Sequence, residues 1–306
     1  MNALSARCSF ARGQKACLRL LFALALGAGS ATAAIRVTDV SGMSVALARP
    51  AERIVSLAPN ITELLFAAGA GARVVGTVEF SNFPHAARQI TRIGDSAQLD
   101  LERIVALRPD LIIAWQSGSA QRQLVQLLHL GIPVFLSDAH RLPDIAREME
   151  RFGRLAGSEN VARQAAQAFL EREAELRRRY AARSPVTVFY QIWDKPLMTV
   201  NGDHLISDVI RLCGGRNVFA DLRSLVAEIS TEAVLAANPE AIGGMTTEAG
   251  QQGNLAGWKS WPRLTAVARG NLFAIHADLI SRDGPRILDA AEQMCAQLDA
   301  ARSRRK

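Results

Sequence analysis

The chain has 306 residues, 49% of them hydrophobic, which is typical of a globular protein with two modest domains. Its formal net charge is +7, but four positive residues lie in the first 33 positions and four more in the last five. The basic residues gather at the two ends and form no basic face with interleaved aromatics, which argues against nucleic-acid binding.

Residues 1–33 have the features of a secretory signal peptide. Four positive residues and no acidic one come before an apolar run at 20–26, and small residues then lead to the A-x-A pattern Ala31-Thr32-Ala33. The apolar run is shorter than the roughly 20 residues of a membrane-spanning helix, which favours a cleaved signal over an anchor. Cleavage near Ala33 would lower the net charge from +7 to +3, since four positive residues are removed.

The cysteines agree with export. Cys8 and Cys17 leave with the signal peptide, whereas Cys213 and Cys295 remain in the mature chain. An even number of cysteines in an oxidising compartment favours pairing, and two buried free thiols are the alternative.

From residue 53 the chain alternates short apolar strands with helices. Asn60 and Glu63, three residues apart, resemble a capping box at the start of a helix that Gly69 ends. The expected strands are 53–57, 74–78, 111–114 and 133–136, and the further helices are 101–107 and 121–130.

The second half repeats this order. A strand is expected at 186–190 and a helix at 203–213, and the segment 230–240 echoes 100–110 at an offset of 130 residues. Both glutamates, Glu102 and Glu232, and both helix-ending prolines share this offset. Alternating strands and helices predict parallel sheets, so two copies predict two Rossmann-like α/β lobes.

Residues 158–183 predict one long helix, capped by Ser158 and carrying a Glu173–Arg177 pair. It either covers one lobe or, at about 1.5 Å per residue, joins the two as a rigid backbone that permits only small lobe movements. The expected organisation is a signal peptide (1–33), an N-terminal lobe (34–141), a helical region (142–183), a C-terminal lobe (184–299) and a frayed basic tail (300–306).

Nothing in the sequence predicts catalysis. The five histidines are scattered, and the sequence contains no HExxH, GxSxG or Gly-rich phosphate loop. His276, which ends a strand beside Asp278, is the best of a weak set. A binding protein without a metal site is therefore favoured over an enzyme.

The carboxyl ends of the strands, where α/β lobes bind ligands, are rich in aromatic residues. Trp115 is the least core-like of these, because it follows an apolar strand and precedes a polar stretch. Flat rings with a few polar groups suit a large, flat, partly apolar ligand.

Glu102 and Glu232 occupy equivalent positions near the start of their helices. The helix dipole favours a carboxylate there and is a sufficient structural explanation. The functional alternative is that twin lobes display twin acidic groups to a two-fold symmetric partner.

The chain resembles the periplasmic cobalamin-binding proteins of ABC importers, within the helical-backbone class of metal-chelate receptors. The resemblance runs from about residue 53 to 298 and is strongest in the segments 53–63, 101–115, 213–219 and 285–288. It implies two lobes joined by a long helix (the class III architecture), with cobalamin or another corrinoid in the cleft, and a periplasmic monomer without a cofactor of its own.

The resemblance also implies partners. Glu102 and Glu232 would dock onto arginines of an ABC permease dimer, which works with its ATPase subunits. Cys213 would bond Cys295.

For the corrinoid site, the resemblance places Phe80 where a tyrosine stands in the family, Trp115 on a tryptophan, and Asp278 and Arg282 on polar contacts. Ser96, Met198 and Val226 fall where large aromatics stand, which removes stacking area worth on the order of 1 kcal/mol per ring. Nearby residues that could compensate are Trp193, Tyr190 and Leu279.

Three other functions stay open. Haem would need an axial ligand, for which Tyr190 and His276 are the candidates, and a catecholate siderophore would need cleft arginines. An exported enzyme on this fold would need a base beside a nucleophile. The scattered histidines argue against a receptor for bare metal ions.

Overall fold

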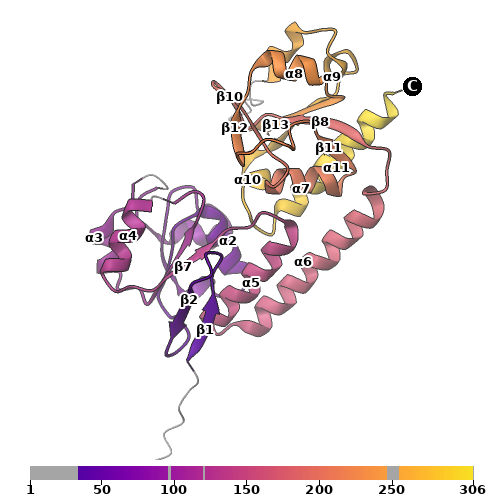
Figure 1. The fold of residues 1–306 in the computed structure, drawn as a ribbon. Coiled ribbons are helices and arrows are strands. Elements are labelled where there is room, and N and C mark those ends of the chain that lie inside the picture. Colours follow the sequence, from indigo (N-terminus) through magenta and orange to yellow (C-terminus); the bar gives the residue numbers. More distant parts are fainter. Residues whose placement is uncertain (1–33, 96–97, 120, 247–254, 306) are drawn as a thin grey trace, which may run out of the picture. The chain divides into compact units, whose positions relative to one another are not determined.

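The N-terminal lobe is built on a five-stranded parallel sheet with the strand order β5-β4-β3-β6-β7. The computed structural model describes residues 34–95, 98–119, 121–246 and 255–305. An antiparallel hairpin precedes the sheet. The elements of this lobe are β1 (Ile35–Thr38), β2 (Ser44–Leu47), β3 (Ile54–Ser56), α2 (Pro59–Ala67), β4 (Val74–Thr77), β5 (Thr91–Arg92), α3 (Leu101–Ala106), β6 (Leu111–Trp115), α4 (Gln121–His129) and β7 (Val134–Ser137) (Figure 1).

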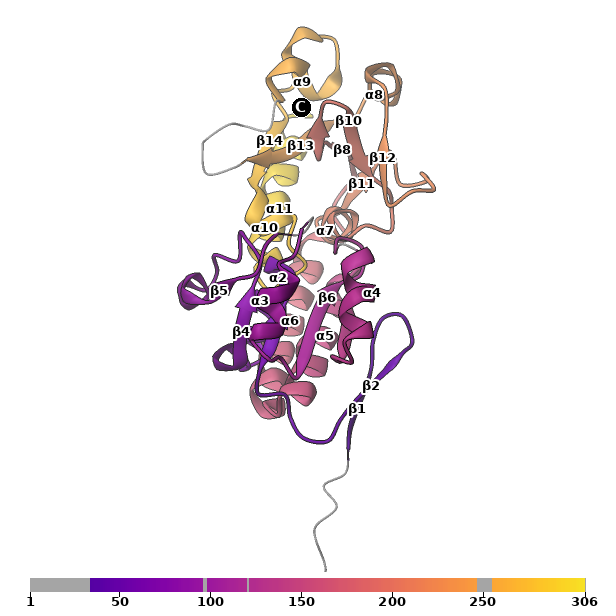
Figure 2. The ribbon, with the colours of Figure 1, turned by 90° about the vertical axis from the view of Figure 1, so that its left-hand side faces the viewer.

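The C-terminal lobe contains a four-stranded parallel sheet with the order β11-β8-β13-β14. A small antiparallel sheet, β12-β10-β9, follows its first strand (Figure 2). The elements are β8 (Val186–Tyr190), β9 (Trp193–Asp194), β10 (Leu197–Val200), α7 (Leu205–Leu212), β11 (Gly215–Asn217), β12 (Val226–Glu228), α8 (Thr231–Ala237), β13 (Ala241–Thr246), α9 (Thr265–Ala268), β14 (Leu272–His276), α10 (Ala277–Ile280) and α11 (Ile287–Ser303). The prediction of two parallel α/β sheets is confirmed.

The repeat extends to the polar atoms that close each helix. Asp100 caps α3 by accepting a hydrogen bond from the Arg103 N–H at 2.9 Å, and Ser230 caps α8 by accepting one from the Ala233 N–H at 3.2 Å. Arg108 and Asn238, again 130 residues apart, both have positive φ angles, of 46° and 40°. The same local geometry therefore leads into β6 and β13.

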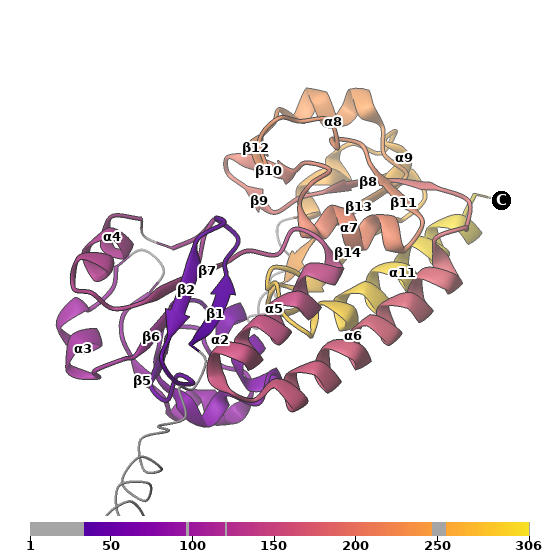
Figure 3. The ribbon, with the colours of Figure 1, turned by 60° about the horizontal axis from the view of Figure 1, so that its bottom comes forward.

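Two helices connect the lobes, α5 (Leu142–Ala156) and α6 (Glu159–Tyr180) (Figure 3). At its start, α6 is tied to the N-terminal lobe, because the Ser158 hydroxyl donates to the Ala68 carbonyl at 2.6 Å. Further along, Arg172 pairs with Asp289 and Glu292 of α11 in the C-terminal lobe. With 22 residues, α6 is about 33 Å long and contacts both lobes. None of the helices in the described ranges has the length and apolar character that crossing a membrane requires.

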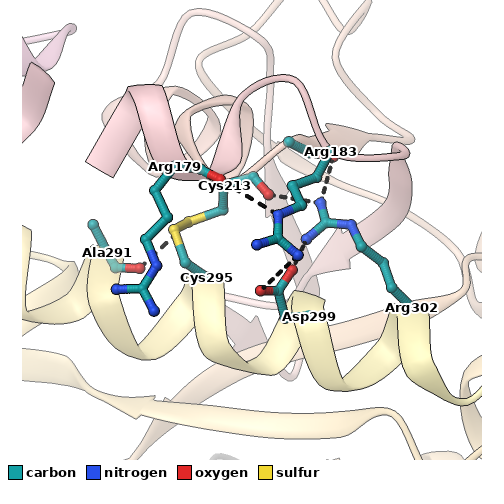
Figure 4. The surroundings of a disulfide bond; sticks show 8 residues. Arg179, Arg183, Cys213, Ala291, Cys295, Asp299 and Arg302 are labelled. Atoms are coloured by element: carbon teal, nitrogen blue, oxygen red, sulfur yellow. Dashed lines mark hydrogen bonds and ion pairs between the residues drawn. A yellow bond between two sulfur atoms is a disulfide. The ribbon is translucent and has the colours of Figure 1, made fainter. Parts of the chain in front are cut away.

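The disulfide joins Cys213, which ends α7, to Cys295 in α11. Figure 4 shows Arg302 beside it, donating to the Cys213 carbonyl at 2.7 Å and pairing with Asp299. The bond ties two elements of the C-terminal lobe that are 82 residues apart in sequence.

Two local expectations are wrong. Asn60 and Glu63 form no capping box, because α2 begins at Pro59, its cap position is Ala58, and Glu63 points instead to two arginines. The basic end is not a solvated tail, since α11 reaches Ser303 and Arg305 donates to Glu240 at 2.8 Å. Lys306 lies outside the described residues.

Candidate functional site

A cavity of about 330 Å³ lies at the carboxyl ends of the central strands, where the sequence predicted the ligand. The N-terminal lobe contributes one lining residue, and the C-terminal lobe contributes all the others. Its walls are mainly apolar, with a few polar groups. The lining residues are Trp115, Ile192, Trp193, Pro196, Met198, His204, Ile206, Met245, Ser281 and Asp283.

Trp115 is held firmly at the end of β6. Its indole Nε1–H donates to the Asp138 carboxylate at 3.0 Å, and its backbone N–H donates to the Ser119 hydroxyl at 3.1 Å. The Ser117 hydroxyl also donates to Asp138. Gly118 lies directly against the ring, because a Cβ there would come within 2.0 Å of it. The ring therefore has a fixed position in the cavity wall.

The small antiparallel sheet supplies the opposite wall. Trp193 on β9 pairs with Met198 on β10, and both line the cavity. The Trp193 side chain is 60% exposed, and its Nε1–H donates to the Lys195 carbonyl at 3.1 Å. Val226, on β12, pairs with Val200 and does not line the cavity. Ser96, also expected at the site, lies outside the described residues.

A buried ionic network joins the lobes beside the cavity. Glu63 of α2 accepts hydrogen bonds from Arg282 at 2.8 Å and from Arg286 at 2.9 Å. Arg282 also donates to Asp278 at 2.6 Å and to the Asn82 side chain at 2.8 Å. The guanidinium of Arg282 is thus committed to protein partners, and a ligand contact by Arg282 or Asp278 would compete with these bonds.

Phe80 stands next to this network. Its ring is 76% exposed, its φ angle is +63°, and its carbonyl accepts a hydrogen bond from Arg282 at 3.0 Å. A bulky residue with positive φ is strained, and such strain is often found at ligand sites. Nearby, the guanidinium carbon of Arg286 lies 4.0 Å from the ring centroid of Phe83.

Three titratable residues near the cavity were missed by the sequence analysis: Asp138, His204 and Asp283. Burial, followed by the charge of His140, lowers the pKa of His204 from 6.5 to about 4. Burial, with a smaller contribution from the charge of Asp138, raises the pKa of Asp283. No motif marks these residues, because they meet only after the lobes have folded.

The two expected docking glutamates are exposed on matching helices. Glu102 is in the first turn of α3, and Glu232 is in the first turn of α8. Hydrogen bonds from its own backbone N–H and from Ser230 lower the pKa of Glu232. Both carboxylates therefore lie at the carboxyl edge of their sheets, from which the capped helices start.

Neither candidate for an axial haem ligand is placed for that task. Tyr190 is fully buried in β8, where its hydroxyl donates to the Gly244 carbonyl at 2.9 Å. His276 accepts a hydrogen bond from the Asp278 N–H at 3.2 Å and does not line the cavity. In the described part of the chain, no group of three or more His, Cys, Asp or Glu residues could hold a metal ion.

Comparison with known sequences gives one family. A family model described as periplasmic binding protein matches residues 54–279. The vitamin B12-binding protein of Vibrio cholerae serotype O1 is 39% identical over 254 residues, which cover 82% of this chain and 91% of that protein. The vitamin B12-binding protein of Yersinia pestis is 38% identical over 251 residues, which cover 82% of this chain and 88% of that protein.

Solved structures show the same fold. The periplasmic vitamin B12-binding protein of Vibrio cholerae superimposes with a TM-score of 0.76 at 37% identity, covering 83% of this chain and 98% of that one. The periplasmic haem-binding protein of Roseiflexus sp. RS-1 superimposes with a TM-score of 0.70 at 24% identity, covering 82% of this chain and 99% of that one. The second likeness is one of fold alone.

Proposed function

Because this chain belongs to the periplasmic binding protein family, a family of transporter binding proteins rather than enzymes, we propose that it carries vitamin B12 or a related corrinoid to an ABC importer. The observation that carries the proposal is 38–39% identity to vitamin B12-binding proteins over 82% of the chain. The protein would bind its cargo without changing it, so no catalytic residue is required.

The geometry of the cavity supports this cargo. Trp115 and Trp193 provide flat apolar surfaces from opposite lobes, and Met198 and Met245 provide polarisable side chains that adapt to an irregular guest. Phe80 adds a further exposed ring next to the interlobe network. We infer that the corrinoid ring lies between these walls and that its periphery meets the polar residues.

The sequence of residues 1–33 supports export to the periplasm with cleavage near Ala33. The disulfide between Cys213 and Cys295 agrees with an oxidising compartment. Glu102 and Glu232 would then face the permease dimer, where two equivalent basic sites could each bind one carboxylate.

Cargo binding can be tested with the purified mature protein and cyanocobalamin, followed by tryptophan fluorescence and calorimetry. We expect saturable binding at micromolar concentration or below. Trp115→Leu should weaken binding on the order of tenfold, because a stacked ring is lost. Trp261→Leu removes an exposed tryptophan that does not line the cavity and is the matched control. No saturable response to any corrinoid would overturn the proposal.

Docking can be separated from binding with the double variant Glu102→Ala/Glu232→Ala. Corrinoid uptake by cells should fall, while the affinity for cyanocobalamin in solution stays unchanged. The matched control is Glu171→Ala/Glu175→Ala, which removes two exposed carboxylates from α6. Lost affinity in the first variant, or equal loss of uptake in both, would contradict this division of roles.

A further inference from the structure

Asp283 is a buried carboxyl group that the fold leaves without a partner. It lies between α10 and α11, is only 9% exposed, and lines the cavity. Within the described ranges, no backbone or side-chain group donates a hydrogen bond to it or forms an ion pair with it. A buried acid of this kind is costly unless something outside the chain satisfies it.

The surroundings of Asp283 carry negative charge and no free cation. Asp138 of the N-terminal lobe is near enough for its charge to raise the pKa of Asp283. His140 pairs with Asp138 at 3.5 Å and turns its ring to that carboxylate. The neighbouring Arg282 is fully engaged with Glu63, Asp278, Asn82 and the Phe80 carbonyl.

The other titratable group of the cavity wall is neutral. The ring Nδ1 of His204 accepts a hydrogen bond from the Ile206 N–H at 3.1 Å, so the proton of the neutral ring is on Nε2. The lining residues of the cavity include no arginine or lysine among those the structure describes. A ligand carboxylate would find no positive charge on this wall.

These contacts decide between two chemical classes of ligand edge. A carboxylate placed beside Asp138 and Asp283 would be a third acid in one poorly hydrated space, where like charges oppose ionisation. A carboxamide carries no charge, and its N–H donates to a carboxyl oxygen whether the acid is ionised or neutral. The Asp283 wall therefore suits an amide edge and opposes an acid edge.

We propose that Asp283 is a specificity-determining residue that accepts a hydrogen bond from a carboxamide side chain of the corrinoid and excludes carboxylate-edged tetrapyrroles. This inference rests on the proposed function. It narrows the cargo to amidated corrinoids and gives a reason, independent of axial ligation, why haem with its propionates is disfavoured.

The test compares dicyanocobinamide, which carries carboxamides, with dicyanocobyrinic acid, which carries carboxylic acids at these ring positions. Affinities are measured by calorimetry at pH 7.5 for the wild type, Asp283→Asn and Asp283→Ala. The control Asp221→Asn removes an exposed carboxyl group outside the cavity. Thermal melting checks that each variant is folded.

The wild type should prefer dicyanocobinamide by about tenfold or more, the ratio expected from one unfavourable charge contact. Asp283→Asn should keep the affinity for dicyanocobinamide within about threefold, because an amide also offers an acceptor, and should bind dicyanocobyrinic acid more tightly. Asp283→Ala should weaken dicyanocobinamide binding by about fivefold, as for one lost hydrogen bond. Asp221→Asn should change neither affinity.

An unchanged preference in both Asp283 variants would overturn this inference and leave the proposed function intact. A wild type that binds the two probes equally would do the same. If the wild type binds neither probe nor cyanocobalamin, the proposed function itself fails.

Discussion

The two lobes share a backbone plan but contribute unequally to the ligand site. Positions 130 residues apart carry matching helix caps and matching residues of positive φ, and Asp110 and Glu240 both accept hydrogen bonds from backbone N–H groups at the start of a strand. At the ends of β6 and β13 the match stops, because Trp115 faces the cavity from one lobe and Met245 from the other.

The difference separates two kinds of constraint. A residue that satisfies a backbone group at a helix or strand end has few replacements, since the same unpaired N–H is present in each copy. A residue that faces the cavity is constrained by the ligand, and the ligand does not have the symmetry of the repeat. The scaffold can therefore be traced through the repeat, whereas the site cannot.

The largest expected effect concerns Glu63, which ties both lobes together. Glu63→Gln removes the only charge between Arg282 and Arg286 on this side of the network, among the described residues, and should lower the free energy of unfolding by about 3–5 kcal/mol. Urea denaturation measures this. Glu102→Gln, an exposed control, should stay within about 0.5 kcal/mol of the wild type. A loss below about 1 kcal/mol for Glu63→Gln would mean that the lobes do not depend on this contact.

The second prediction uses His204, which has no counterpart in the N-terminal lobe. Its pKa is about 4 in the folded protein and 6.5 when exposed, so the unfolded chain binds more protons between these values. The stability that this residue contributes is present above pH 6.5 and is lost as the pH falls toward 4, by ~3 kcal/mol. His204→Asn retains a helix-capping residue and removes the titration.

The measurement is the free energy of unfolding of wild type and His204→Asn from pH 7.5 to pH 4. Other groups titrate in both proteins, so only the difference between the two curves reports on His204. The wild type should lose the larger amount as the pH falls. Parallel curves would show that the imidazole is not protected by the fold.

The smallest expected effect tests the repeat itself. Asp100→Ala and Ser230→Ala each remove one capping acceptor, and each should cost about 1 kcal/mol of unfolding free energy. The two costs should add in the double variant, since the caps lie in different lobes. Chemical denaturation of the three variants provides the comparison. A cost confined to one lobe would show that the equivalent helices are stabilised differently.

The sequence was sufficient for features that depend on local pattern. The alternation of strands and helices, the long helix α6 and its Glu173–Arg177 pair, at 2.8 Å, were all predicted. The sheet β12-β10-β9 was not, because its strands have only two to four residues and show no periodicity.

Long-range contacts were beyond the reach of local rules. Glu63 was assigned to a helix cap because Asn60 stands three residues before it, yet its partners Arg282 and Arg286 lie more than 200 residues away. Asp283, followed by Gly284 and Pro285, reads as an ordinary turn residue. Only the fold brings it to a buried wall.

The anchored C-terminus has a practical consequence. Arg304 and Arg305 bind Asn271 and Glu240, which immediately precede β14 and β13, so the chain ends at the amino edge of the second sheet. That edge is opposite the one from which the ligand is held. A fluorophore or surface tether attached after the last residue would thus leave the entrance unobstructed, and immobilised protein should capture its cargo as freely as protein in solution.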